Sequence, residues 1–251
     1  MAMLVPIWIL MALWLTFVAV AGVLAFQQWR KTGGSIRTQF LYLWVGSTIV
    51  FIGDLLHTIA VTVSTYTGNP TGPVTIRGSI FEFRTFAMFF DALVFIVYYA
   101  LWALFIVSRY QQGRRTPYDT MTLGLAVTAM VLLLPGAVPN ALGVYTLEYT
   151  IAIWAPHIIL FIVFGVMAVG KLIACSRHVL KQATDPALQT RERALSIAGT
   201  GFACSFLFFT LFLLLTTFNS EPGIFMILKT FAYMIAFFYL IKDFIRSPAH
   251  T

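Results

Sequence analysis

Residues 4–26 read LVPIWILMALWLTFVAVAGVLAF, an apolar run that contains no charged side chain. An α-helix needs roughly 20 such residues to cross a hydrocarbon core about 30 Å thick, so this run is long enough to span a membrane. It lacks the features of a cleaved signal peptide, because no basic residue precedes it and the segment QQWRK at residues 27–31 offers no small-residue cleavage site. The run therefore predicts a retained transmembrane helix.

Six more apolar runs of comparable length follow along the chain. They cover residues 40–63, 80–107, 121–138, 151–174, 195–218 and 224–244. The connections at 66–73 and 219–223 are rich in Gly, Pro, Asn and Ser, which are typical of turns. We find no internal repeat, low-complexity tract or soluble domain. The sequence thus predicts an all-α, polytopic membrane protein, a seven-transmembrane-helix bundle that forms a single domain over residues 1–251.

The composition also places the chain among membrane proteins. Its residues are 60% hydrophobic and 10% charged, against roughly 45–50% and 25% in an average soluble domain. So much apolar surface excludes a disordered chain. The net charge is +7, but the basic residues lie between the apolar runs and form no continuous surface, so we do not expect nucleic acid as a partner. Two cysteines are too few for a disulfide framework.

Lysine and arginine residues gather at every second connection. Of the 16 basic residues, all except Arg77, Arg84 and Lys229 lie beside the ends of odd-numbered runs or the starts of even-numbered runs. The positive-inside rule keeps such segments on the cytoplasmic side of a membrane. We therefore expect a multi-pass protein of the plasma (inner) membrane, with its N-terminus outside and its C-terminus in the cytoplasm.

Six ionisable residues of the apolar runs need an account, because charge is costly inside a membrane. A charged side chain at the centre of a membrane helix costs roughly 2.5–3.5 kcal/mol on insertion scales, so such residues usually face the bundle interior and indicate function. Counted at about 1.5 Å per residue from the flanking basic residues, five of them fall in one layer of the outer half, and Arg84 lies at its rim. The six are Asp54, His57, Arg84, Asp91, His157 and Lys229.

Helical spacing places some of these residues on shared faces. Asp54 and His57 are three residues apart, and Arg84 and Asp91 are seven apart, so each pair lies on one side of its helix. Two interpretations follow. The charges either neutralise one another as buried ion pairs that fix helix register, or they surround a polar pocket that is open to the outer surface. Both interpretations predict that the six side chains converge.

Three short motifs resemble those of a known family. They are GDLLHT at residues 53–58, FR at 83–84 and LKTFAY at 228–233. In these motifs the chain resembles the seven-helix membrane-associated sensor domains that precede bacterial histidine kinases and diguanylate cyclases. The resemblance implies functional roles for Asp54, His57, Arg84 and Lys229 and an output on the cytoplasmic side. The chain ends at Thr251 without an output domain, so we expect a stand-alone relative that signals through a cytoplasmic or membrane partner.

The favoured function is therefore sensing or binding of a small molecule that reaches the bundle from the outer side of the lipid bilayer. An acidic or zwitterionic ligand suits Arg84 and Lys229, because Arg offers a bidentate fork and Lys a point charge. In this hypothesis Asp54 and Asp91 balance the two cations. His57 and His157 supply hydrogen bonds or pH dependence. The pattern does not indicate catalysis.

Four other chemistries remain open. Asp54, His57, Asp91 and His157 offer ligands for a metal such as zinc. His57 and His157 lie at overlapping depths, as a bis-His b-type haem requires. Lys229 could carry retinal with Asp91 as its counter-ion. However, the third helix lacks the usual Arg three residues before the carboxylate, and the sixth helix lacks the Trp and Pro expected of a retinal pocket. The buried carboxylates and His residues are also compatible with proton or ion transport.

Overall fold

The computed structural model describes residues 4–66, 73–76, 79–141, 147–217 and 223–246. These residues form seven α-helices and one two-stranded hairpin. The last helix continues directly into a π-helix, η1, at Leu240–Ile245. The α-helices are α1 (Leu4–Lys31), α2 (Gly34–Tyr66), α3 (Phe83–Tyr110), α4 (Pro117–Ala141), α5 (Leu147–Gln182), α6 (Pro186–Thr217) and α7 (Gly223–Tyr239).

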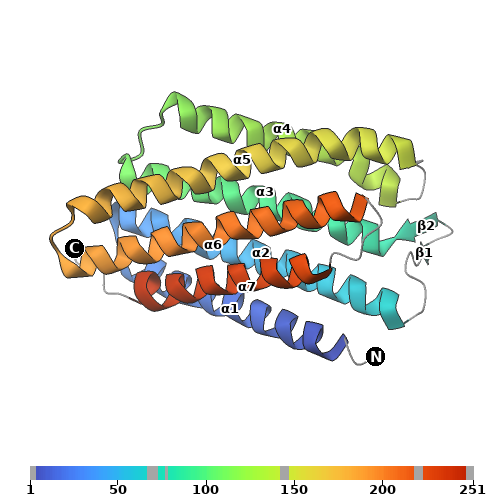
Figure 1. Cartoon of the computed structure of the whole chain (residues 1–251), viewed down its shortest axis with the longest axis horizontal. Coiled ribbons are helices and arrows are strands. Elements are labelled where there is room, and N and C mark those ends of the chain that lie inside the picture. The colour runs from blue at the N-terminus through green and yellow to red at the C-terminus, as the bar shows by residue number, and fades with distance from the viewer. Residues whose placement is uncertain (1–3, 67–72, 77–78, 142–146, 218–222, 247–251) are drawn as a thin grey trace.

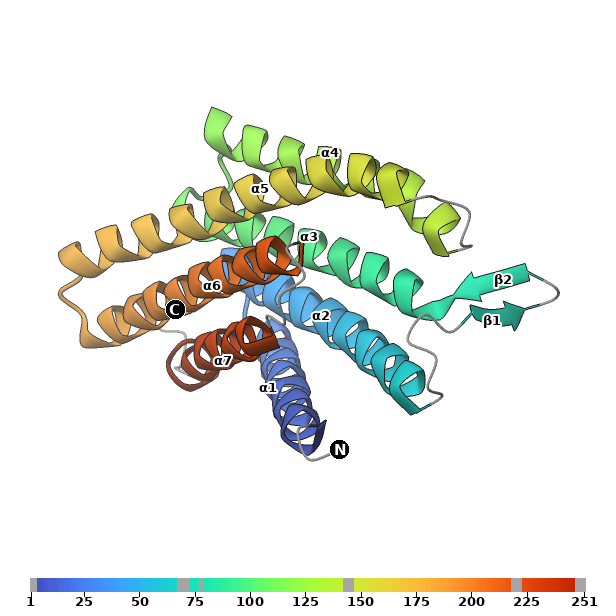
Figure 2. The ribbon, with the colours of Figure 1, turned by 45° about the vertical axis from the view of Figure 1, so that its right-hand side comes forward.

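The helices form one bundle in which consecutive helices run in opposite directions (Figure 1). Each helix packs against the next one, and α7 together with η1 returns to α1, so the bundle closes on itself. α4 lies at one edge, against α3 and α5 (Figure 2). The ends of α1, α3 and α5 therefore meet the starts of α2, α4 and α6. We call this the basic end, because it carries the basic residues at the connections between these helices and in η1.

Five helices are long and apolar enough to cross a membrane, within the part of the chain that the structure describes. The helices are α1, α2, α3, α5 and α6, and their candidate membrane spans are Ile9–Lys31, Gly34–Ile59, Ala92–Tyr110, Ile159–Gln182 and Pro186–Leu211. The expected all-α bundle of membrane character is thus confirmed. Membrane crossing by α4 and α7 stays a prediction, because the apolar segment found in α4, Pro117–Leu133, is shorter and α7 has 17 residues.

A β-hairpin precedes α3, where the sequence predicted that the third helix begins at residue 80. Strand β1 (Pro73–Ile76) pairs with the antiparallel strand β2 (Ser79–Glu82), with Val74 opposite Phe81. The hairpin extends from the bundle at the end opposite the basic end (Figure 2). The predicted helix start was wrong because β-branched and aromatic residues favour a strand here, and Pro73 is tolerated at a strand's first position.

The helices at the basic end are longer than the apolar runs that predicted them. α5 continues to Gln182 and α6 begins at Pro186, so the basic connection between them is short. Lys, Arg, Gln and Leu are good helix formers, so the helix does not end where the apolar run ends. The Asp185 carboxylate caps α6, because it accepts hydrogen bonds from the backbone N–H groups of Ala187 and Leu188 at 3.1 and 3.3 Å.

Two glycines allow neighbouring helices to approach closely. A Cβ atom at Gly53 would lie 2.9 Å from a methyl carbon of Val94, and one at Gly201 would lie 2.8 Å from the backbone oxygen of Ala232. Real side chains do not tolerate these distances, so glycine is required for α2 to meet α3 and for α6 to meet α7 in this way. Gly53 directly precedes Asp54, and the close packing therefore fixes where Asp54 lies.

Candidate functional site

Asp54 lies inside the bundle and is held by a residue of the first helix. Asp54 is only 8% exposed, and Trp14 Nε1 of α1 donates a hydrogen bond to Asp54 Oδ2 at 2.7 Å. Trp14 itself is 4% exposed. A hydrogen bond to a buried carboxylate is stronger than one between neutral groups. The sequence predicted a functional role for Asp54 but not for Trp14, because Trp14 lies in an apolar run and its indole N–H does not make it look polar.

Lys229 of α7 lies among aromatic rings from three helices. Its Nζ atom is 4.8 Å from the ring centroid of Phe209, 5.1 Å from that of Phe95 and 5.9 Å from that of Tyr233. These rings belong to α6, α3 and α7. Ammonium groups are attracted to ring faces at such distances. The backbone of the same residue is fixed as well, because Ser205 Oγ of α6 donates a hydrogen bond to the Lys229 carbonyl oxygen at 2.8 Å.

Tyr233 connects these two charged residues. Its ring lies 5.2 Å from the ring of Trp14, which holds Asp54, and 5.8 Å from the ring of Phe95, which contacts Lys229. Its hydroxyl group forms a 2.6 Å hydrogen bond with the Tyr99 hydroxyl group. We call this set the Tyr233 cluster. It consists of Trp14, Asp54, Phe95, Tyr99, Phe209, Lys229 and Tyr233.

His157 lies one ring away from the Tyr233 cluster. The residue is 2% exposed, and its Nδ1 atom is 3.1 Å from the backbone oxygen of Ala129 on α4. A carbonyl oxygen only accepts hydrogen bonds, so Nδ1 carries the proton in this contact. The imidazole ring stacks on Phe161 at 6.3 Å, and Phe161 in turn contacts Tyr99 and Phe209 of the cluster.

The remaining predicted site residues are placed less completely. His57 is half-buried on α2, one turn beyond Asp54. Arg84 and Asp91 lie in α3, but their side chains are outside the described residues. The structure therefore brings Asp54 and Lys229 together through Tyr233, with His157 nearby. The convergence of His57, Arg84 and Asp91 on the same point stays a prediction.

The metal hypothesis needs several ligating side chains close to one another. Among the described residues there is no group of three or more His, Cys, Asp or Glu side chains that could hold a metal ion. Asp54 and His157 are instead engaged with Trp14 and Ala129. Asp91, the fourth candidate ligand, lies outside the described side chains.

A second polar network, at the basic end, was missed by the sequence analysis. Glu192 of α6 is 1% exposed and forms an ion pair with Arg109 of α3. Arg109 Nε also donates to Glu192 Oε1 at 3.1 Å, and Arg109 Nη1 donates to Gln39 Oε1 of α2 at 3.1 Å. The Tyr110 hydroxyl group donates to Glu192 Oε2 at 2.6 Å. The sequence indicates only an orienting charge at Arg109, whereas the structure shows that this residue links three helices.

The π-helix packs on this network through one aromatic ring. The guanidinium carbons of Arg109 and Arg191 each lie 5.1 Å from the ring centroid of Phe244. Phe244 is 1% exposed. The end of the seventh helix is thereby attached to α3 and α6 by two cation–π contacts. A lone Glu between Arg191 and Arg193 was the signal in the sequence that could have revealed this network.

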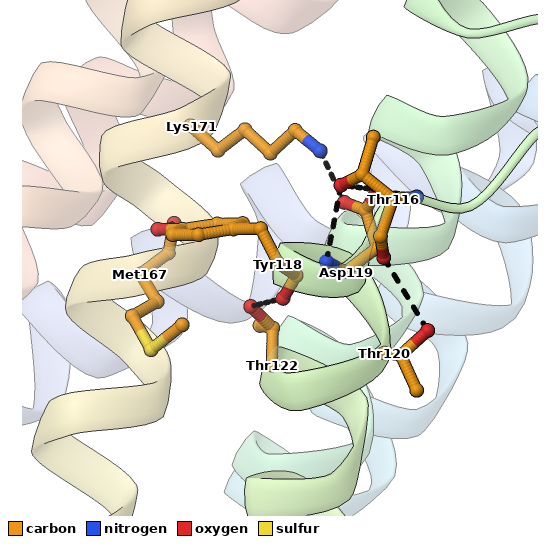
Figure 3. A network of polar contacts seen from close by, with 7 residues as sticks. All are labelled: Thr116, Tyr118, Asp119, Thr120, Thr122, Met167 and Lys171. Carbon is orange, nitrogen blue, oxygen red and sulfur yellow. Dashed lines mark hydrogen bonds and ion pairs between the residues drawn. The ribbon is translucent and has the colours of Figure 1, made fainter.

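A third network joins the start of α4 to α5 (Figure 3). Lys171 pairs with Asp119, which is 2% exposed, and the Thr116 hydroxyl and N–H groups donate to Asp119 Oδ2 at 2.6 and 2.8 Å. Burial raises the pKa of the Asp119 carboxyl, but the hydrogen bonds from Lys171 and Thr116 outweigh burial and hold this pKa below its usual value. For Lys171, too, the sequence indicates only an orienting charge, whereas the structure pairs it with Asp119.

Comparisons with known proteins yield no relative. No protein-family model matches the chain, and no curated protein or solved structure matches it. The resemblance to membrane-associated sensor domains is therefore carried by the three short motifs alone, and the function must be argued from the contacts described above.

Proposed function

We propose that the chain is a seven-helix sensory or ligand-binding module of the plasma (inner) membrane. In this proposal the N-terminus is outside, the basic end is cytoplasmic, and a small acidic or zwitterionic molecule binds in the outer half of the bundle. The observation that carries the proposal is the position of Lys229. It is a half-buried cation among aromatic rings, on the helix that leads to the Arg109–Glu192 network.

The contacts of Lys229 favour an anionic ligand. Cation–π contacts are worth about 0.5–2 kcal/mol, less than a well-formed hydrogen bond between an ammonium and a carboxylate in a site without water. An arriving carboxylate therefore gains a charged partner that is already positioned. We assign Arg84 as the second cation, Asp54 and Asp91 as balancing charges, and His57 and His157 as hydrogen-bonding or pH-dependent groups.

The path from Lys229 to the basic end supports a signalling role. Lys229, Tyr233 and Phe237 follow one another at four-residue spacing on α7, and Phe237 contacts Trp14 at 5.2 Å. The helix then becomes the π-helix, whose Phe244 packs against Arg109 and Arg191. π-Helical segments often occur at functional sites. In the proposal, movement of Lys229 towards a ligand shifts α7 and changes the surface that a partner meets in the cytoplasm.

A thermal-shift screen with purified protein tests the proposal. The panel contains amino acids, dicarboxylates and other small acids, and it is applied to the wild type, Lys229→Met and the matched control Lys242→Met. Lys242 is an exposed lysine that lies 5.9 Å from the Phe238 ring, so the control also removes a lysine beside an aromatic ring. Met packs well against aromatic rings, so both variants are expected to fold.

We expect at least one acid to raise the Tm of the wild type and of Lys242→Met. Its affinity for Lys229→Met should fall at least tenfold, because the charged partner is lost. A panel without any stabilising acid, or an acid that stabilises Lys229→Met equally well, would contradict the proposal.

Spectroscopy of the same preparation separates the proposal from the cofactor alternatives. A Soret band would indicate haem at His57 and His157, and a visible band bleached by hydroxylamine would indicate retinal at Lys229. Zinc at one equivalent per chain would indicate the metal site. Each of these results would replace ligand sensing by cofactor chemistry.

A further inference from the structure

A polar pocket opens at the basic end, between the start of α2 and the end of α3. Its cavity volume is about 600 Å³. Ser35, Thr38 and Ser108 line it together with Arg109 and Arg115, and the Ser108 hydroxyl group donates to the Ser35 carbonyl oxygen at 3.5 Å. The lining contains two arginines and no Asp or Glu side chain, and because Arg109 is paired with Glu192, Arg115 supplies the net positive charge of the pocket. It is separate from the Tyr233 cluster.

The chain reversal after α3 forms one wall of this pocket. Gln112 and Gly113 both have positive φ, at 52° and 84°. The Gly113 N–H donates to the carbonyl oxygen of Val107, six residues back, at 3.1 Å, and the Arg114 N–H donates to the Gln111 carbonyl oxygen at 2.9 Å. This turn folds the chain back over the end of α3, and Arg115 joins the lining as a result.

One of the two arginines is held rigidly. Arg109 donates through Nε and Nη2 to Glu192 and through Nη1 to Gln39. A guanidinium group has five N–H donors, so these three bonds leave two donors for a second acceptor. Arg115, by contrast, is exposed. The pocket thus offers one fixed and one adjustable guanidinium group beside the hydroxyl groups of Ser35 and Thr38, a set of donors that suits the oxygens of a phosphate.

The other end of the pocket is apolar. Leu104 and Val107 of α3 line it on the side towards the middle of the bundle, next to the ring of Tyr42. Along α3 the lining therefore changes from Leu104 to Ser108 and Arg109 within little more than one helical turn. A lipid molecule has the same change, from an acyl chain to a charged headgroup. Basic pockets between membrane helices on the cytoplasmic side are suited to anionic headgroups.

We propose that this pocket binds an anionic phospholipid of the cytoplasmic leaflet. The phosphate group lies between Arg109, Arg115 and the hydroxyl groups of Ser35 and Thr38, and the start of the acyl chain lies against Leu104 and Val107. This site adds a lipid specificity that the proposed ligand site does not require, since it contains no residue of the Tyr233 cluster.

Lipid titrations of the purified full chain in neutral detergent, followed by native mass spectrometry, test the site. The probes are phosphatidylglycerol and phosphatidylcholine with the same acyl chains. We expect phosphatidylglycerol to bind more tightly than phosphatidylcholine. Arg115→Gln should weaken phosphatidylglycerol binding about fivefold. Arg114→Gln is the matched control, because it removes the same charge from an exposed neighbour that does not line the pocket.

A second variant covers the possibility that Arg115→Gln disturbs the turn. Thr38→Val keeps the size of the side chain and every charge but removes one hydroxyl donor, so it should also weaken phosphatidylglycerol binding and leave phosphatidylcholine binding unchanged. Lys229→Met should retain phosphatidylglycerol binding, which separates failure of this site from failure of the proposed ligand site.

Three results would overturn the proposal. They are equal binding of the two lipids, equal losses in Arg114→Gln and Arg115→Gln, and competition by inorganic phosphate or glycerol 3-phosphate at the concentrations at which phosphatidylglycerol itself binds. The last result would assign the pocket to a soluble phosphate compound.

Discussion

Asp54, Asp119 and Glu192 are the buried carboxylates of the described residues. Each is held by a different kind of donor. Asp54 accepts from an indole N–H, Asp119 from an ammonium group and a helix-capping threonine, and Glu192 from a guanidinium fork and a phenol. Buried carboxylates are stable only when such donors compensate for lost hydration. The donor sets show that Asp119 and Glu192 serve packing at the basic end, where Lys171 and Arg109 compensate their charges.

The charged residues in apolar surroundings are evident from the sequence, but their partners are not. Asp54 and Lys229 were recognised because a charge within an apolar run is unusual. Trp14 was not, since its polar N–H belongs to a residue that counts as apolar. Glu192 was overlooked because it lies in a basic segment that looked like a solvated connection, whereas α6 begins at Pro186 and buries it.

The pKa of Asp119 leads to a prediction about pH. Because its folded pKa lies below the unfolded value of about 3.9, the contacts of Asp119 stabilise the fold above that pH and this contribution is lost as the pH falls towards the folded pKa. Asp119→Asn should therefore cost about 1.5–3 kcal/mol at pH 7 and clearly less at pH 3. Thermal unfolding in detergent at both pH values measures the difference.

Asp185→Asn serves as the control for this prediction. Asp185 is an exposed helix cap, and Asn caps helices equally well, so the control should change stability little. An equal loss of stability at pH 7 and pH 3 for Asp119→Asn would contradict the prediction.

At the scale of elements, the end of the seventh helix is the part that the sequence predicted least well. The apolar run at 224–244 predicted one continuous α-helix, but the chain changes to a π-helix at Leu240. The Arg246 N–H donates to the Ile241 carbonyl oxygen at 3.3 Å, the five-residue spacing of a π-turn. The wider turn buries Phe244 and leaves Lys242 exposed. No residue pattern in LIKDFI marks this change, and the contacts that Phe244 makes with Arg109 and Arg191 come from helices distant in the sequence.

Phe244→Leu tests the attachment of the π-helix. The substitution keeps an apolar side chain but removes both cation–π contacts, each worth roughly 0.5–2 kcal/mol. Amide hydrogen exchange in Leu240–Ile245 should therefore become about tenfold faster or more. Phe238→Leu is the control, because Phe238 is 45% exposed and lies on the same helix. Unchanged exchange in Phe244→Leu, or equal acceleration in both variants, would show that the two guanidinium contacts do not hold the segment.

At the scale of the whole molecule, the antiparallel order of the helices and the single basic end followed from hydropathy and charge alone. The packing partners did not. α1 closes the bundle by placing Trp14 against Tyr233 and Phe237 of α7. In one sequence, apolar faces that meet lipid and apolar faces that meet another helix look alike, because lipid tails are as apolar as leucine. The Tyr233 cluster could therefore not be assembled before the structure was known.

Cysteine labelling in intact cells tests the proposed orientation. In a background with Cys175→Ser and Cys204→Ser, one variant carries Thr75→Cys in strand β1 and a second carries Arg114→Cys at the basic end. A membrane-impermeant maleimide should label the first variant at least ten times faster than the second, because the positive-inside rule places the basic end in the cytoplasm. Permeabilised cells provide the control, in which both positions should react. Faster labelling at position 114 in intact cells would reverse the orientation.

The contacts of the two charged residues also have an order in time. Trp14 precedes Asp54 along the chain, and Phe95 and Phe209 precede Lys229. A protein is synthesised from its N-terminus, so each of these charges leaves the ribosome after side chains that contact it in the finished bundle. The insertion machinery therefore never handles Asp54 before its indole partner exists, and when Lys229 emerges the rings of Phe95 and Phe209 have already been made.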